Sequence, residues 1–260
     1  MTAGENDLAS AHAPGCTVVV GAAGDLGAVI SRRLAREGHS LVLVGRGREP
    51  LEELHAHVPD SRVITCDVTQ DDDVARLAAH TGPVRMLVYT PAAPTAGGID
   101  HASPEAILAA VDVKVGGLLR CLRSLQPAAG PDLAPVVVIG GNLAFDPIPD
   151  AATSGIANAA QANAVRQLQE TLPHAGWRIH VVAPGPVETP RWDALAAAEA
   201  ERRGVAVEEI RKSATAKSPL GRLTTTEEVA WAVAALADPH AGALHGSTLL
   251  LDTGRRRAIP

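Results

Sequence analysis

The stretch VVVGAAGDLGAVISRRLAREGHSLVLVGR, residues 18–46, predicts a strand, a glycine-rich turn, a helix and a second strand. An apolar run begins at Cys16 and ends at Gly21, and Gly24 and Gly27 follow within the turn. Glycine permits a tight turn and lets a phosphate group approach the amides at the N-terminus of the next helix. The stretch therefore predicts a nucleotide-binding unit, although strand-to-helix packing alone would also explain the glycines.

Asp25 stands between the second and third of these glycines, where the common dinucleotide pattern does not place an acid. Its carboxylate would repel a pyrophosphate at short range. Alternatively, Asp25 could cap the helix and point to solvent. Asp25 therefore argues against dinucleotide binding unless its charge is directed elsewhere.

The composition fits one soluble α/β domain: the chain has 260 residues, 46% of them hydrophobic, and no long apolar segment. A net charge of −6 provides no basic face for nucleic acid. Cys16, Cys66 and Cys121 lack the spacing of a metal site, and their odd number indicates reduced thiols in the cytoplasm. We expect a small-molecule ligand and no metal, membrane or nucleic-acid partner, with residues 1–14 as a flexible tail.

Strand and helix patterns alternate through residues 15–260, without repeats or linkers. This alternation predicts a single Rossmann-like, doubly wound parallel sheet of about seven strands with helices on both faces. Ser103-Pro104-Glu105 predicts a helix start, with Ser103 as the cap and Pro104 at the first helical position, and long helices are expected at about 112–126 and 154–172. Residues 190–217 predict two short amphipathic helices that cover a substrate pocket, with Trp192 either a pocket wall or ordinary packing.

Residues after the second and third strands bear on the choice of cofactor. Gly45 occupies the place where proteins specific for NAD usually carry an acid, and Arg46 and Arg48 follow, which favours NADP. The two arginines could instead be surface charges. Asp67 follows the third strand, at the end of the sheet where open α/β folds bind ligands, and could contact adenine.

From Cys16 to Gly254 the chain resembles the short-chain dehydrogenase/reductase family. The segments that carry the resemblance are GAAGDLG (21–27), CDVT (66–69), PGPVET (184–189), SPLGRLTTTEEVA (218–230) and LLLDTG (249–254). The resemblance implies a homodimer or homotetramer and NADP(H) as cofactor, with Thr189 at the nicotinamide amide. The implied cofactor-binding residues are Gly21, Gly24, Leu26, Gly27, Arg46, Asp67, Val68 and Thr189.

The catalytic positions that the resemblance implies are all changed. The family's Asn, Ser, Tyr and Lys correspond here to Lys114, Gly141, Ser154 and Asn158. With Asp25, the loss of the lysine that holds the nicotinamide ribose, at Asn158, puts cofactor binding in doubt. A positioned general acid contributes about 10²–10⁴ in rate, so ordinary ketone reduction should be crippled.

These changes predict an atypical enzyme that acts on a small organic, biosynthetic metabolite by redox-neutral dehydration, isomerisation or cyclisation. Two alternatives stay open. One is an NADP-dependent carbonyl reductase that uses non-standard residues. The other is a catalytically silent subunit or a nucleotide-responsive regulator.

Five side chains could act in such a site: Lys114, Tyr89, Ser154, Asn158 and Asn142. Burial would lower the pKa of Lys114 and make it an acid, a base or a nucleophile. Lys114 could instead bind an anion, pair with a carboxylate such as Asp146, or extend outward. Tyr89 could supply a phenol or simply pack. Ser154 and Asn158 lie one helical turn apart and should face one pocket, and Asn142 could donate a hydrogen bond or form a turn.

Overall fold

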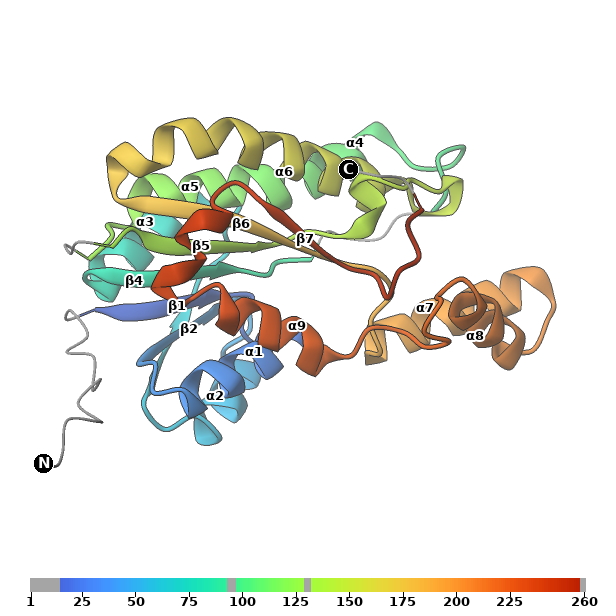
Figure 1. Cartoon of the computed structure of the whole chain (residues 1–260), viewed down its shortest axis with the longest axis horizontal. Coiled ribbons are helices and arrows are strands. Elements are labelled where there is room, and N and C mark those ends of the chain that lie inside the picture. Colours follow the sequence, from blue (N-terminus) through green and yellow to red (C-terminus); the bar gives the residue numbers. More distant parts are fainter. Residues whose placement is uncertain (1–14, 93–96, 129–131, 258–260) are drawn as a thin grey trace, which may run out of the picture.

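A computed structural model of the protein describes residues 15–92, 97–128 and 132–257, so the predicted tail lies outside it. Seven strands form one sheet in the order β3-β2-β1-β4-β5-β6-β7, and every neighbouring pair is parallel (Figure 1). The strands are β1 Cys16–Val20, β2 Leu41–Gly45, β3 Ser61–Thr65, β4 Val84–Tyr89, β5 Ala134–Ile139, β6 Trp177–Pro184 and β7 Thr248–Leu251. The predicted fold class is confirmed.

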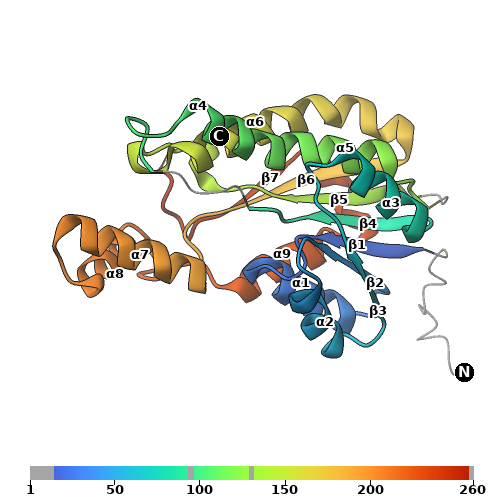
Figure 2. The same cartoon turned by 180° about the vertical axis from the view of Figure 1, so that it is seen from behind.

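The central strands are almost completely buried, because helices cover both faces of the sheet (Figures 1 and 2). On one face, apolar side chains of α3 (Asp71–Thr81), α5 (Gly117–Ser124) and α6 (Ala152–Thr171) join the core. On the other face, α1 (Asp25–Arg36), α2 (Arg48–Ala56) and α9 (Thr226–Ala235) do so. This arrangement explains why strand segments such as 41–44 are apolar without alternation.

The order of the strands reverses between β1 and β4. The chain builds outward from β1 to β3 and then returns to place β4 on the other side of β1. In open α/β sheets, ligands bind at the carboxyl ends of the strands beside such a reversal. The carboxyl end of the sheet, where β1, β4, β5 and β6 finish, is therefore the place to look for a site.

The helix start predicted at Ser103-Pro104-Glu105 is confirmed, whereas the long helix predicted at about 112–126 does not begin separately there. The helix begins at Pro104, where the Ser103 hydroxyl accepts a hydrogen bond from the Ala106 amide at 3.2 Å. Helix α4 (Pro104–Val111) continues into α5 through one turn of π-helix at Asp112–Gly116, called the wide turn below. A π turn adds one residue to a helical turn. The apolar residues before it and after it therefore do not follow one continuous helical periodicity.

Helices α7 (Pro190–Arg203) and α8 (Val207–Ala216) form a pair that extends beyond the carboxyl end of the sheet (Figures 1 and 2). The two predicted short helices are thus present, whereas their role in covering a substrate stays a prediction. Within the described residues, no helix combines the length and apolar character needed to cross a membrane.

Candidate functional site at the carboxyl end of the sheet

The glycine turn after β1 is shaped by close backbone contacts. Gly21 has a φ of 79°, and an added Cβ there would lie 2.5 Å from the Thr90 hydroxyl oxygen. A Cβ on Gly27 would lie 2.1 Å from the Gly21 carbonyl oxygen, so α1 can start against the turn only with glycine at this position. Gly24 donates its amide to the Gly21 carbonyl at 3.0 Å. The turn therefore has the tight form that lets a phosphate approach the start of α1.

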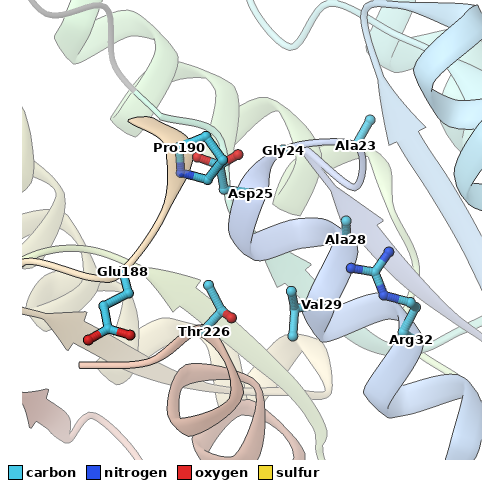
Figure 3. Close-up of a pocket in the computed structure, with 9 residues that line it drawn as sticks. All are labelled: Ala23, Gly24, Asp25, Ala28, Val29, Arg32, Glu188, Pro190 and Thr226. Atoms are coloured by element: carbon cyan, nitrogen blue, oxygen red, sulfur yellow. The ribbon is translucent and has the colours of Figure 1, made fainter. Parts of the chain in front are cut away.

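Asp25 does not cap α1, so that interpretation is wrong: the N-cap is Gly24, and no side chain caps this helix. The Asp25 carboxylate instead accepts a hydrogen bond from the Arg191 amide in the first turn of α7, at 3.3 Å. Figure 3 shows this carboxylate beside Pro190. The negative charge is thus directed toward the positive end of another helix dipole.

A groove of about 350 Å³ lies between α1, the start of α9 and the segment that precedes α7 (Figure 3). It carries charges of both signs, because Asp25, Glu188 and Arg32 line it. The rest of its lining is small or apolar, apart from Thr226. The groove borders the glycine turn, which contributes Ala23 and Gly24.

At the carboxyl end of β2, Arg46 is exposed directly after the strand, while Arg48 forms an ion pair with Glu52 at 2.9 Å. Asp67 accepts hydrogen bonds from the amide and hydroxyl of Thr69, at 3.0 and 2.8 Å. The hydrogen bond from the Thr69 amide lowers the pKa of Asp67, and the positive charge of Arg46 contributes to this shift. Two of the predicted cofactor-binding residues, Arg46 and Asp67, are therefore near enough for Arg46 to influence the Asp67 carboxyl.

Three other predicted cofactor contacts have structural roles. The Val68 side chain is 7% exposed and belongs to the core, which leaves only its backbone for a ligand. The Leu26 side chain is half-buried and packs against the core on the face covered by α1. The Thr189 hydroxyl caps α7 by accepting a hydrogen bond from the Trp192 amide at 3.1 Å.

Lys114 lies in the wide turn and is 5% exposed. Its Nζ donates a hydrogen bond to the carbonyl oxygen of Ile139, the last residue of β5, at 2.9 Å. Among the described residues no carboxylate lies within 4 Å of this ammonium. Pairing with Asp146 and extension into solvent, the two simpler interpretations, are therefore wrong. Burial lowers the pKa of Lys114 to about 8, and the positive charge of Arg191 adds to this effect.

Tyr89 ends β4 inside the core, with no exposed surface. Its hydroxyl donates a hydrogen bond to the Val113 carbonyl in the wide turn, and burial raises the pKa of the phenol well above its usual value. This geometry corrects the prediction of Tyr89 as a catalytic phenol, because the proton is committed to the helix backbone. The alternative packing role is the one observed.

Asn158 is 8% exposed, and its Oδ1 has no hydrogen-bond partner among the described residues. A Cβ on Gly141 would lie 2.6 Å from the Asn158 Nδ2, so the amide occupies the space that a serine at 141 would need. Ser154, one turn earlier in α6, is half-buried, as is Asn142 just after β5. Asn158 therefore packs against the segment after β5, and the expectation that Ser154 and Asn158 face one pocket stays a prediction.

Gln161 is a buried polar residue that the sequence reasoning missed. It lies three residues after Asn158 in α6 and has no exposed surface. Its Nε2 donates to the Lys114 carbonyl at 3.0 Å, while its Oε1 has no partner among the described residues. The signal was available, because a glutamine three residues after Asn158 lies on nearly the same helical face.

Trp192 forms part of a recess of about 320 Å³ between the segment before α7 and helices α7 and α8. The Arg211 guanidinium lies 5.1 Å from the centre of the indole ring and pairs with Asp193 at 2.6 Å. The pocket-wall interpretation of Trp192 is supported. What the recess binds stays a prediction.

Metal and thiol chemistry find no support within the described residues. They contain no group of three or more His, Cys, Asp or Glu side chains that could hold a metal ion. The three cysteines are buried and free. Burial raises the pKa of Cys66 to about 11 and that of Cys121 to about 12, which makes poor nucleophiles of these thiols.

Known proteins resemble the chain over nearly its whole length. A family model described as enoyl-(acyl carrier protein) reductase matches residues 21–256. Cis-4-hydroxycyclohexanecarboxylate dehydrogenase of Sinomonas cyclohexanicum is 30% identical over 267 positions, covering 95% of this chain and 98% of that enzyme. A putative ketoacyl reductase of Streptomyces coelicolor is 28% identical, covering 89% and 93%. The structure of an actinorhodin polyketide ketoreductase variant with NADPH superposes with a TM-score of 0.83 at 26% identity, covering 94% and 98%.

Proposed function

The chain belongs to the short-chain dehydrogenase/reductase family, and we propose that it is an NADP(H)-dependent oxidoreductase that interconverts a ketone and a secondary alcohol. We infer that the family's catalytic Asn, Ser, Tyr and Lys are replaced here by Lys114, Gly141, Ser154 and Asn158. The observation that carries the proposal is the buried ammonium of Lys114 at the carboxyl end of β5.

The relatives favour redox chemistry over our redox-neutral prediction. Two of them are named as a dehydrogenase and a putative ketoacyl reductase, and the similar ketoreductase structure contains NADPH. Redox-neutral chemistry becomes the second candidate, because none of the four replacements restores a tyrosine. The substrate-covering role of residues 190–217 and assembly into a homo-oligomer stay proposals by analogy with relatives.

The residues around the glycine turn fit a dinucleotide. An added Cβ at Gly21 or Gly27 would clash with neighbouring atoms, so the turn keeps its backbone close to the start of α1. The Asp25 carboxylate is bound to the Arg191 amide, which reduces its repulsion of a pyrophosphate. The unpartnered Oδ1 of Asn158 could accept a hydrogen bond from a ribose hydroxyl. Arg46 is exposed, where it could bind a 2′-phosphate.

In the proposed reaction, a bound NADPH would supply the hydride that the carbonyl carbon accepts. The Lys114 ammonium donates one proton to the carbonyl oxygen, directly or through one water, and becomes a neutral amine. It recovers the proton from solvent. The hydrogen bond to the Ile139 carbonyl holds the side chain in place, and burial brings its pKa close to neutrality, as general acid catalysis requires.

The test is NADPH consumption by the purified protein with small ketones, and NADP⁺ reduction with cis-4-hydroxycyclohexanecarboxylate as a first alcohol. Lys114→Met removes the acid while keeping an unbranched side chain, and should lower kcat for ketone reduction by about 10²–10⁴. Lys217→Met, at an exposed lysine, is the matched control and should leave kcat unchanged. An equal kcat for wild type and Lys114→Met would remove Lys114 from the mechanism.

The pH dependence gives an independent check with a definite sign. Ketone reduction needs the protonated ammonium, which predominates below the Lys114 pKa of about 8 and is lost above it. The kcat for reduction should therefore be constant below pH 8 and fall about tenfold per pH unit above it, with no such break near pH 8 in Lys114→Met. If NADPH binds but none of the ketones tested causes its oxidation, redox-neutral chemistry becomes the preferred function.

A further inference from the structure

The segment after β7 forms a fixed turn at the carboxyl end of the sheet. We call residues 252–257 the C-terminal turn. The buried Asp252 carboxylate accepts hydrogen bonds from the amides of Gly254 and Arg256, each at 3.0 Å. Thr253 has a φ of 57°, the one positive value at a non-glycine residue in the described chain. These bonds hold the turn in one conformation, which fixes the side chains that follow it.

The C-terminal turn contacts three segments that surround the candidate site. The Arg255 Nη1 donates to the Ala214 carbonyl of α8 at 2.8 Å. The Arg255 Cδ lies 3.6 Å from the position of a Cβ on Gly185, just after β6. The Arg256 guanidinium lies 5.4 Å from the centre of the Phe145 ring, in the segment that follows β5. Figure 1 shows the chain after β7 running from the base of the α7–α8 pair toward the segment before α6.

Both guanidinium groups therefore lie where a substrate of this fold is expected. Neither has a carboxylate within 4 Å among the described residues. Burial is the largest effect on the Arg255 guanidinium and lowers its pKa. Asp252 and Asp146 raise this pKa from a longer range, but by less. Two arginines that have lost part of their hydration, without an ion pair, form a favourable site for an anion.

We propose that Arg255 and Arg256 bind a carboxylate of the substrate, so that the enzyme acts on an oxo acid or its hydroxy acid. This proposal rests on the proposed function, because it concerns the substrate of the same site. Planar guanidinium groups match the two oxygens of a carboxylate. The acids Asp146 and Asp252 stand close enough to influence Arg255, so they oppose a second negative charge and favour a carboxylate over a phosphate.

Binding measurements test the proposal without turnover. Isothermal titration of the NADPH-loaded protein compares cyclohexanecarboxylate with the neutral cyclohexanecarboxamide. Wild type should bind the carboxylate at least about tenfold more tightly, and Arg255→Gln or Arg256→Gln should each weaken carboxylate binding by about tenfold or more, leaving carboxamide binding unchanged. The matched control is Arg257→Gln, since Arg257 is the exposed neighbour, and it should behave as wild type. Thermal unfolding of each variant verifies that the fold is intact.

Several outcomes would overturn the proposal: no binding of the carboxylate by wild type, equal affinity for the carboxamide, or an equal loss in Arg257→Gln. Tighter binding of cyclohexyl phosphate than of the carboxylate would also overturn it. If the carboxylate binds as expected but 4-oxocyclohexanecarboxylate consumes no NADPH, anion recognition stands and the proposed redox function fails. If neutral ketones are reduced but Arg255→Gln and Arg256→Gln bind the carboxylate as tightly as wild type, the proposed redox function stands and the proposed carboxylate recognition fails.

Discussion

The two halves of the sheet's carboxyl end differ in how strongly backbone contacts restrict which residues can stand there. Beside β1 and β2, the glycine turn is fixed by backbone contacts so close that Gly21 and Gly27 admit no side chain. Beside β4 and β5 lie Lys114, Gly141 and Asn158, where we propose that the family's catalytic Asn, Ser and Lys have been replaced. A position whose Cβ would meet backbone atoms admits only glycine, whereas a side chain that projects from the backbone can be changed without moving it.

The contacts in the second half are compatible with the replacements that we propose. The Asn158 amide fills the space beside Gly141, and Gln161 binds the carbonyl of Lys114. A glycine after β5 is therefore the partner of a larger amide in α6. If the family residues were replaced as we propose, restoring a serine at Gly141 alone should destabilise the protein, because its Cβ would clash with Asn158.

The largest expected effect breaks the first half. Gly27→Val places a side chain against the Gly21 carbonyl and should lower the free energy of unfolding by about 3 kcal/mol or more. Gly45→Ala is the control, since its Cβ would meet Leu51 at an ordinary 3.5 Å. Urea unfolding of both variants provides the measurement. Equal stability of Gly27→Val and wild type would mean that the turn is more adaptable than its contacts indicate.

An intermediate effect sharpens the comparison in the second half. Gly141→Ser should cost about 1–3 kcal/mol, because its Cβ would lie 2.6 Å from the Asn158 Nδ2. Asn158→Ala removes that amide, so the double variant should recover about 1 kcal/mol or more. A double-mutant cycle by chemical denaturation measures this coupling. Strictly additive effects would show that Gly141 and Asn158 are not energetically coupled.

The smallest effect is a gain. Gly155 lies inside α6, and a Cβ there would meet only the Leu143 carbonyl, at 3.7 Å. Gly155→Ala should therefore raise the free energy of unfolding by about 0.5–1 kcal/mol, because alanine loses less backbone entropy. A melting temperature below that of wild type would indicate that this glycine, like Gly27, is required by packing.

The fold followed from the sequence because buried parallel strands and capped helices leave local patterns. The predicted seven-stranded parallel sheet and the helix start at Ser103–Pro104 are present, whereas the junction between α4 and the helix predicted at about 112–126 was not foreseen. The site was harder to predict, since its contacts join distant residues. The Lys114 ammonium meets a carbonyl 25 residues later, and Arg255 meets one 41 residues earlier. No local pattern encodes such distances.

The wide turn at Asp112–Gly116 changes the helical phase between α4 and α5. Two of its carbonyl oxygens, on Val113 and Lys114, are held from outside the helix by Tyr89 and Gln161. These two hydrogen bonds stabilise the extra residue that the π turn contains. Deleting one residue there would rotate the α4 segment by about 100° relative to α5 and break both hydrogen bonds. The single tyrosine of this chain thus contributes to the architecture of a helix joint instead of to chemistry.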